Sequence, residues 1–451
     1  MNYDTQIQEL DIIYLIEEKR FAELKGYISE MNPVDLAEII DDLDETNSLL
    51  VMRLLPKELG VEVFSYFDVD KQKEIVAMIS DEELKYILDE LYFDDMIDLL
   101  EEMPAEFVSD VLKNAPYSQR RLINEFLNYP KDSAGSIMTI EYVSFNENMT
   151  VQDAIDHIRD IGMTKETVYT CYVTNRSSKL VGIVSLRKLV TEDVNKKIGD
   201  IMDTDIITVN THDDQEEVAE VFKKYDFLAI PVVDNEYRLT GIITVDDIMD
   251  VIEEEATEDF QKMAAMAPSD EEYLDTSVIT LAKHRITWLL ILMVSATFTG
   301  AIIDGYSSVL AKVSKLQIFI PMLMDTGGNA GSQSSTLIIR GLAVGEISIK
   351  DFFKVIRKEV SIALLVGTTL ATINFLRLIL IERLDVTISF VVSATLIFTV
   401  LMAKIIGGVL PIVAKKLKLD PAIMAGPFIT TLVDAGSLII YFRFASAFLH
   451  I

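Results

Sequence analysis

The distribution of apolar residues divides the chain in two. Up to residue 275, apolar positions recur at helical or alternating spacing, and no stretch reaches the roughly 20 apolar residues that cross a bilayer. Beyond residue 285, five apolar stretches follow one another, at 286–304, 316–341, 360–381, 386–414 and 421–447. This pattern predicts a multidomain membrane protein, in which a soluble part precedes an all-α transmembrane domain of five helices over residues 284–451.

Residues 1–130 carry a weak internal repeat. Pro33, Pro56, Ser80 and Pro104 each open an amphipathic stretch, and they are 23, 24 and 24 residues apart. Proline and serine are common at the first positions of a helix. A repeat this short fits pairs of helices that bury one another's apolar faces, so we expect a small α-solenoid with an acidic surface.

A second repeat has an offset of 59 residues. The stretch "KLVGIVSLRKLV" (179–190) aligns with "RLTGIITVDDIM" (238–249), and each follows a helical stretch and a β-branched run. This order of helix, strand, turn, strand and helix resembles the paired cystathionine-β-synthase (CBS) domains. It predicts tandem α/β modules at 138–200 and 201–252.

CBS domains often bind nucleotides, with the acid of a [ST]-x-x-D run on the ribose. Thr244 and Asp247 match that run in the second copy, whereas Lys188 stands in the place of the acid in the first copy. Together with Arg187 and Phe227, they form a candidate nucleotide site. ATP binding stays an open alternative.

An acidic stretch leads from the second module toward the first span. The sequence "VDDIMDVIEEEATEDFQKM" predicts a long helix, of which residues 253–275 form a connecting (plug) helix. Like charges three or four residues apart cost about 0.2–0.5 kcal/mol per pair unless water or a cation screens them. The candidate metal-binding acids of this stretch are Asp246, Asp247, Asp250, Glu254, Glu255, Glu258 and Asp259. An exposed acidic linker without a bound ion is the alternative.

Charge follows the same division of the chain. Residues 1–275 hold 63 acidic and 24 basic residues, whereas residues 276–451 hold 9 and 16. Such an acidic soluble half argues against nucleic-acid binding, because phosphate contacts need basic surface, and it suits a surface that attracts cations. The single cysteine, Cys171, excludes an intramolecular disulfide.

The positive-inside rule orients the five predicted spans. The segments before the first span, between the second and third, and between the fourth and fifth hold ten Lys and Arg residues, against five on the other side. We therefore expect the N-terminal half in the cytosol, the spans in the cell (plasma or inner) membrane and the C-terminus outside.

The second predicted span is unusually polar. Within "PMLMDTGGNAGSQSSTLIIRG" (321–341), Asp325, Asn329, Gln333 and Thr336 follow one another as one helical stripe, and we expect Leu337 and Ile338 on the opposite face. Lipid offers polar groups no hydrogen-bonding partner. The stripe therefore either packs against another helix or lines water.

The fifth predicted span carries Asp434 near mid-membrane. A carboxylate at that depth is costly and by default indicates a functional site. An ion pair with Lys404 of the fourth span is the alternative, although Lys404 lies nearer the cytosolic end, where it can snorkel. We favour a water-filled pore that both spans line.

These features resemble the MgtE family of magnesium channels over nearly the whole chain. The resemblance rests on "TVDDIMDVIEEEATEDFQKM", "TGGNAGSQSSTLIIRGLAVGEI" and "TLVDAGSLIIYF". It implies a homodimer with one pore on its two-fold axis and no enzymatic activity. It also implies that Asp434 is the selectivity carboxylate, with Asn329, Ser332 and Thr336 beside it, and relatives often have Asn where this chain has Ser332.

We therefore expect a magnesium-selective importer that cytosolic Mg²⁺ closes, by bridging the acids of the connecting helix and carboxylates of the N-terminal domain that include Asp94 and Asp95. Magnesium keeps its waters and binds through one or two carboxylates, which fits such surfaces. A proton-linked secondary transporter and a membrane-anchored Mg²⁺ sensor without conduction are the alternatives.

Overall fold

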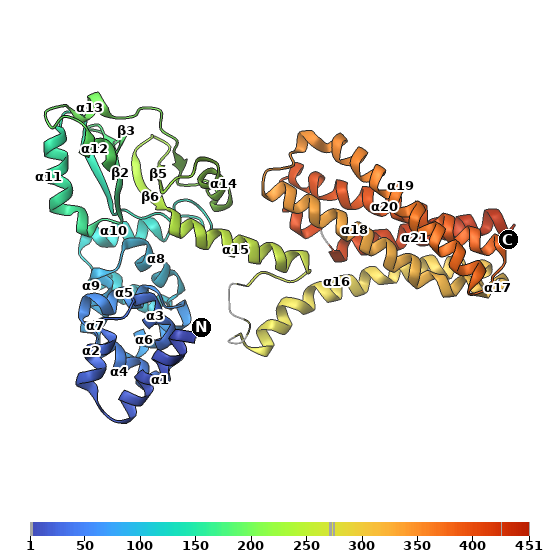
Figure 1. Ribbon diagram of the computed structural model, residues 1–451, viewed down its shortest axis with the longest axis horizontal. Helices are drawn as coiled ribbons and strands as arrows, with labels where there is room; N and C mark the ends of the chain where they lie inside the picture. The colour runs from blue at the N-terminus through green and yellow to red at the C-terminus, as the bar shows by residue number, and fades with distance from the viewer. Residues whose placement is uncertain (1–2, 270–272, 274–275, 425, 451) are drawn as a thin grey trace. The chain divides into compact units, whose positions relative to one another are not determined.

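The computed structural model describes residues 3–269, 273, 276–424 and 426–450. It forms two compact units, Met1–Val251 and Ile252–Ile451 (Figure 1). The first unit holds the N-terminal helices and both α/β modules, and the second holds the long apolar helices. One helix, α15 (Val245–Met263), contributes residues to both units.

The N-terminal domain is a row of short helices in pairs, as predicted. Pro33 is the first residue of α3, and Pro56, Ser80 and Pro104 are the residues that cap the N-termini of α5, α7 and α9. The repeat of 23 or 24 residues is therefore one helix pair, which confirms the solenoid. The helices are α1 (Tyr3–Glu17), α2 (Phe21–Ile28), α3 (Pro33–Asp41), α4 (Glu45–Leu54), α5 (Lys57–Ser65), α6 (Val69–Met78), α7 (Asp81–Glu90), α8 (Phe93–Glu102), α9 (Ala105–Asn114) and α10 (Tyr117–Phe126).

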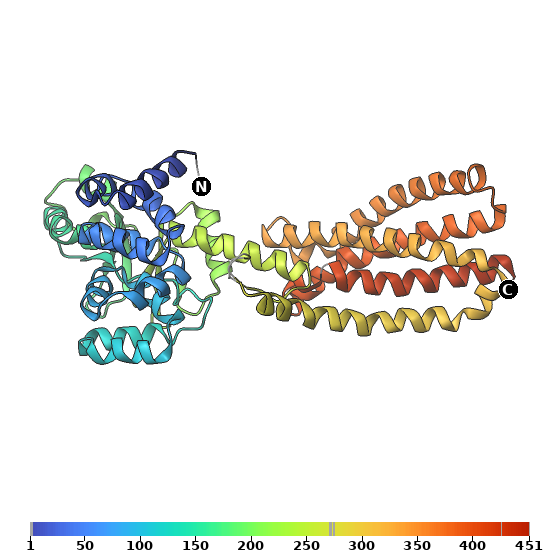
Figure 2. The same ribbon diagram turned by 90° about the horizontal axis from the view of Figure 1, so that it is seen from below.

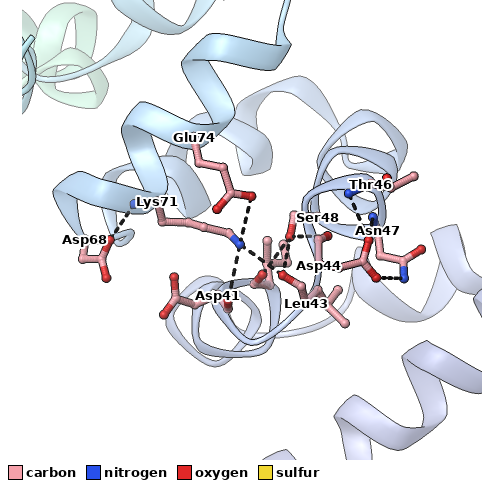
Figure 3. Close-up of polar contacts among 10 residues, drawn as sticks. Asp41, Leu43, Asp44, Thr46, Asn47, Ser48, Asp68, Lys71 and Glu74 are labelled. Carbon is pink, nitrogen blue, oxygen red and sulfur yellow. Dashed lines mark hydrogen bonds and ion pairs between the residues drawn. The ribbon is translucent and has the colours of Figure 1, made fainter. Parts of the chain in front are cut away.

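A buried lysine satisfies carbonyl groups at the end of a helix in this solenoid. Lys71 of α6 is 5% exposed, and its Nζ donates to the carbonyl oxygens of Asp41 (3.3 Å) and Leu43 (3.2 Å) at the end of α3 (Figure 3). The Ser48 hydroxyl of α4 donates to the Leu43 carbonyl as well, at 3.1 Å. The last carbonyls of a helix have no partner within it, so these side chains satisfy groups that would otherwise be buried unpaired.

The two α/β modules repeat the same three-stranded sheet. In each sheet the first two strands are parallel and the last two antiparallel. Strands β3 and β6 have equivalent bounds with the predicted offset of 59 residues. The elements are β1 (Tyr142–Asn146), α11 (Val151–Ile161), β2 (Thr167–Thr174), β3 (Leu180–Ser185), α12 (Leu186–Thr191) and α13 (Ile198–Ile201), then β4 (Val209–Asn210), α14 (Gln215–Tyr225), β5 (Ala229–Val233) and β6 (Leu239–Thr244).

The connecting helix ends earlier than expected. The sequence predicted helix over 253–275, whereas α15 begins at Val245, directly after β6, and ends at Met263. Ala265 has a φ of 54°, and the Met266 N–H donates to the Gln261 carbonyl at 2.9 Å. A left-handed residue with this hydrogen bond terminates a helix, and the following proline, Pro268, cannot continue it.

The second unit is a bundle of long helices that lie side by side (Figure 2). Four of the described helices are long and apolar enough to cross a membrane, and they correspond to the first, third, fourth and fifth predicted spans. The helix at the second predicted span, α18, is long enough but too polar to be counted with these four. The helices are α16 (Val278–Gly305), α17 (Ser307–Lys312), α18 (Ile320–Ala343), α19 (Phe352–Leu380), α20 (Val386–Lys416) and α21 (Gly426–Leu449).

The polar helix α18 lies inside this bundle, packed against α20 and α21. At its N-terminal end, Leu323 belongs to an apolar cluster with Leu396 of α20 and Leu438 of α21. In the same cluster, the buried Tyr441 hydroxyl donates to the Leu316 carbonyl at 3.0 Å. This core holds one face of α18 and leaves the other uncovered.

Candidate functional site

The polar stripe of α18 lies on the uncovered face of the helix. Asp325, Asn329, Gln333 and Thr336 are exposed in the single chain, and Ser332 beside them is half-buried. The opposite face is buried, and in the middle of the helix it consists of small residues: Gly327, Gly328, Ala330, Gly331, Ser334 and Ser335. The helix therefore separates its polar groups from its packing groups, as a helix that lines water would.

The prediction that Leu337 lies on the face opposite the stripe was wrong. Ile338 is buried, as predicted for the face opposite the stripe, but Leu337 is 66% exposed. Leu337 follows Thr336 by one residue, and a step of about 100° keeps it on the edge of the uncovered face.

The small residues bring helix backbones into direct contact. A Cβ atom added to Gly407 of α20 would overlap with the Gly331 carbonyl of α18, and one added to Gly327 would lie 2.8 Å from Val433 Cγ1 of α21. These glycines therefore set how closely α18 approaches its neighbours.

We expect Gly407→Ala to destabilise the second unit, because the added methyl meets backbone rather than a movable side chain. Overpacking of this kind costs about 1–3 kcal/mol. The matched control is Gly300→Ala in α16, where an added Cβ meets nothing within 4 Å. Thermal unfolding of both variants in detergent should show a lower Tm for Gly407→Ala alone, and equal Tm values would contradict the close contact.

Asp434 lies on α21, half-buried, where that helix packs on α18. The Asp325 carboxylate of α18 is close enough to Asp434 to repel it electrostatically. Among the described residues Asp434 makes no ion pair, and the Lys404 Nζ donates instead to the Ser334 hydroxyl at 3.1 Å. The interpretation of Asp434 as the partner of Lys404 is therefore not supported.

A cluster of carboxylates, most of them half-buried, lies in the first unit. Asp94 and Asp95 of α8 lie near Asp246 and Asp247, which occupy the first turn of α15. The cluster also contains Glu141 and Glu166, which precede β1 and β2 and are joined by a backbone hydrogen bond of 2.9 Å. Sequence reasoning missed these two glutamates, since isolated acids before strands give no signal.

Burial raises the pKa values of several carboxylates in this cluster. Burial first, and the Asp247 carboxylate second, raise the pKa of Asp94 well above its ordinary value and that of Asp95 to about 6. Burial and the neighbouring Asp246 raise the pKa of Glu166 to about 7. One Asp94 oxygen is buried without a hydrogen-bond partner. The cluster therefore holds closely spaced negative charge that only protons or cations can relieve.

The described carboxylates are not gathered around one point as the ligands of a bare ion would be. Hydrated magnesium needs no such arrangement, because its water shell fills the distance between ion and carboxylate. Asp247 is held in place by Thr244, whose hydroxyl and backbone N–H donate to it at 2.6 and 3.2 Å. This pair, which the sequence associated with a ribose, takes part in the acidic cluster.

The last turns of α15 belong to the second unit, where an ion-pair network joins them to the segment before α21. Lys262 Nζ lies 2.5 Å from Glu258 Oε1 and 2.6 Å from Asp420 Oδ2, in the segment before α21. Burial, then Asp420, raise the pKa of Asp259 to about 6. Met263 packs against Ile339 of α18. Glu254 and Glu255 lie further up the same helix, and Asp250 lies in the first unit near Asp247.

The two α/β modules enclose a cavity of about 870 Å³, within the size range of small-molecule sites. Arg187 of α12 and Phe227, which precedes β5, line this cavity. The other two candidate nucleotide residues, Thr244 and Asp247, are not among its lining residues. The structure thus divides the predicted nucleotide residues between two places.

A unit of long apolar helices packed on one polar helix, in a chain that also holds an acidic solenoid and a CBS pair, is typical of a membrane transport protein with additional soluble domains. The profile of the MgtE family, described as a divalent cation transporter, matches residues 320–444. The profile of the MgtE intracellular N domain matches 31–132, and that of the CBS domain matches 134–195 and 198–254.

Relatives match over the full length of the chain. The magnesium transporter MgtE of Thermus thermophilus is 36% identical over 96% of this chain and 97% of its own length. The magnesium transporter MgtE of Bacillus subtilis is 34% identical over 100% and 99%. The chain belongs to the MgtE family of magnesium transporters, which are not enzymes.

A solved structure supports the fold of the soluble part. The crystal structure of the cytosolic domain of the Mg²⁺ channel MgtE in complex with ATP has a TM-score of 0.52 and 34% identity, and the match covers 54% of this chain and 99% of that one.

Proposed function

We propose that this transporter is a magnesium-selective channel that imports Mg²⁺ and that cytosolic Mg²⁺ closes. The uncovered polar stripe of α18 is the observation that supports a pore. In one chain alone, Asp325, Asn329, Gln333 and Thr336 would face lipid, which cannot satisfy them. A second copy that faces this stripe across a two-fold axis would enclose a polar, water-filled path.

In such a homodimer the two Asp434 carboxylates would face one another across the axis. Two carboxylates edged by the oxygens of Asn329, Ser332 and Thr336 can hold a hydrated ion by its water shell. Binding of this kind is strong enough to select a divalent ion and weak enough to release it. The inside-negative potential favours inward flow by about 2.3 kcal/mol per charge per 100 mV.

Cysteine accessibility tests this path. Cysteines at Asn329, Ser332 or Thr336 should react with small aqueous thiol reagents in the conducting state, because water reaches the stripe. A cysteine at Ile338, on the buried face, is the matched control and should not react. Equal labelling of both faces would reduce the stripe to helix packing and remove the pore.

The half-buried carboxylate cluster supports the regulatory part of the proposal. Two like charges at 4 Å repel by up to about 4 kcal/mol at an effective dielectric of about 20. Without cations, Asp94 and Asp95 would therefore be driven away from Asp247. Hydrated Mg²⁺ between them would favour the compact arrangement of the first unit.

The helix α15 offers a direct route from this cluster to the second unit. Its first turn carries Asp246 and Asp247, and its last turn carries Lys262, which pairs with Asp420 beside α21. Any tilt of a continuous helix moves both of its ends. We infer that closure of the acidic cluster moves the segments that Lys262 and Met263 contact, and so closes the path.

The membrane orientation follows from the basic residues. The N-terminal half and the ion-binding acids then lie in the cytosol, α18 is the second of five spans, and the C-terminus is external. Regulation by ATP is a second proposal, which Arg187 and Phe227 in the cavity of the α/β modules support, together with the ATP complex of the related cytosolic domain. Loss of ATP binding in Arg187→Ala would test it.

A further inference from the structure

Two buried charges meet within the helical bundle, away from the polar stripe. Glu359 of α19 is 6% exposed and Lys404 of α20 is 5% exposed. Ser334 of α18, 1% exposed, lies between them: its hydroxyl donates to Glu359 Oε2 at 2.6 Å and accepts from Lys404 Nζ at 3.1 Å. This network, which we call the buried charge network, ties three helices together.

The surroundings of the buried charge network explain why it matters for α18. Near it, α18 meets its neighbours through small groups: Gly331 contacts Gly407, and an added Cβ at Gly408 would lie 3.0 Å from Glu359 Cγ. Small residues allow close approach but interlock little, so they resist the rotation of a helix about its axis only weakly. Directional hydrogen bonds to a fixed hydroxyl do resist it.

Ser334 also lies close to the polar stripe along the helix. It lies two residues from both Ser332 and Thr336, on the other side of the helix. Each residue of an α-helix is turned by 100° from the one before it. Fixing the direction in which the Ser334 side chain points therefore fixes the directions of the Ser332 and Thr336 side chains. A buried charge pair is weak evidence for stability. Such pairs are known, however, to specify one arrangement of the helices that they join.

We propose that Glu359, Ser334 and Lys404 are positioning residues for magnesium permeation, which fix the rotation of α18 so that its polar stripe faces the ion path. The inference rests on the proposed function, because it requires that α18 lines that path. None of the three side chains touches the ion. They act through the orientation of Ser332 and Thr336.

The test uses the full chain in liposomes and single-charge variants. Glu359→Gln keeps the shape but leaves Lys404 buried without a countercharge, and we expect the preference for Mg²⁺ over K⁺ to fall about tenfold or more. The double variant Glu359→Gln with Lys404→Gln removes both charges and should recover most of the selectivity. The matched control is Glu382→Gln at the end of α19, whose partner Arg377 is not part of the network.

Cysteine labelling separates positioning from general damage. In Glu359→Gln, labelling should fall at Thr336 and rise at Ile338, while the protein stays monodisperse. If Glu359→Gln does not fold, Ser334→Ala, which keeps both charges, should give the same shift. Parent-like labelling and selectivity in both variants would overturn the inference. Equal labelling of both faces in the parent would instead overturn the proposed pore itself.

Discussion

We expect Asp434→Ala to abolish magnesium-selective flux and to leave the protein folded. Asp434 is half-buried on α21, makes no ion pair among the described residues and lies near Asp325. Its removal therefore breaks no stabilising contact of the bundle, and it lowers the repulsion with Asp325. What it removes is the charge that attracts a hydrated divalent ion.

The reason for a large effect is electrostatic. The attraction between a carboxylate and a cation scales with the charge of the cation, so a carboxylate favours a divalent over a monovalent ion. The low dielectric of the bilayer strengthens this attraction. Asp434→Asn keeps the shape without the charge and should lose most of the preference for Mg²⁺ over K⁺. Flux of both ions into liposomes, normalised to monodisperse protein, measures this.

A matched control is Asp385→Asn, whose carboxylate only caps the N-terminus of α20. It should conduct like the parent. Parent-like Mg²⁺ permeation by a well-folded Asp434→Ala protein would sink the assignment of Asp434 as the selectivity carboxylate.

We expect neutralisation of the acidic cluster to uncouple conduction from internal Mg²⁺. The triple variant Asp94→Asn, Asp95→Asn and Asp247→Asn should conduct at high internal Mg²⁺, where we expect the parent to be silent. Amides do not hold the hydrated ion, and buried amides without partners still cost about 1–3 kcal/mol each. The compact arrangement thus loses the ions that hold it together and gains no attraction in return.

A full switch between closed and open states needs about 5.5 kcal/mol of differential binding, which several weak sites can supply together. The control is Asp89→Asn, an exposed acid at the end of α7. Single-channel recording across internal Mg²⁺ is the measurement, and a triple variant that closes as readily as the parent would remove the cluster from the gating account.

The same cluster makes the compact arrangement pH-dependent. The pKa values of Asp95 and Glu166 are raised to about 6 and about 7, so the compact arrangement binds more protons than the separated one. The stability of the compact arrangement without Mg²⁺ should therefore rise as pH falls from about 7 to about 4. Above about pH 7 the contribution of the bound protons is lost. Limited proteolysis in Mg²⁺-free buffer at pH 5 and 7.5 checks this, and greater protection at pH 7.5 would contradict it.

Local signals in the sequence predicted most of the fold. The repeat openers Pro33 and Ser80 begin helices because helix starts depend on a few adjacent residues. The 59-residue offset reproduced the bounds of β3 and β6. The polar stripe and Asp434 stood out because lipid makes such groups exceptional.

Partnerships between distant residues could not be predicted in this way. Glu141 and Glu166 join Asp94 only through packing of the solenoid on the α/β modules, and Glu359 reaches Ser334 only through the arrangement of α18 and α19. Lys404 looked like a snorkelling cation because its hydroxyl partner is 70 residues away. Helix ends that depend on one left-handed residue, such as Ala265, are equally hidden from periodicity.

We propose that magnesium acting on the first unit closes a magnesium path through the second. The most direct measurement is Mg²⁺ uptake by the purified parent protein in liposomes, with an imposed inside-negative potential, no proton gradient and internal Mg²⁺ set to a series of fixed concentrations. We expect rapid uptake at low internal Mg²⁺ that falls steeply as internal Mg²⁺ rises. Uptake that ignores internal Mg²⁺, or that requires a proton gradient, would contradict it.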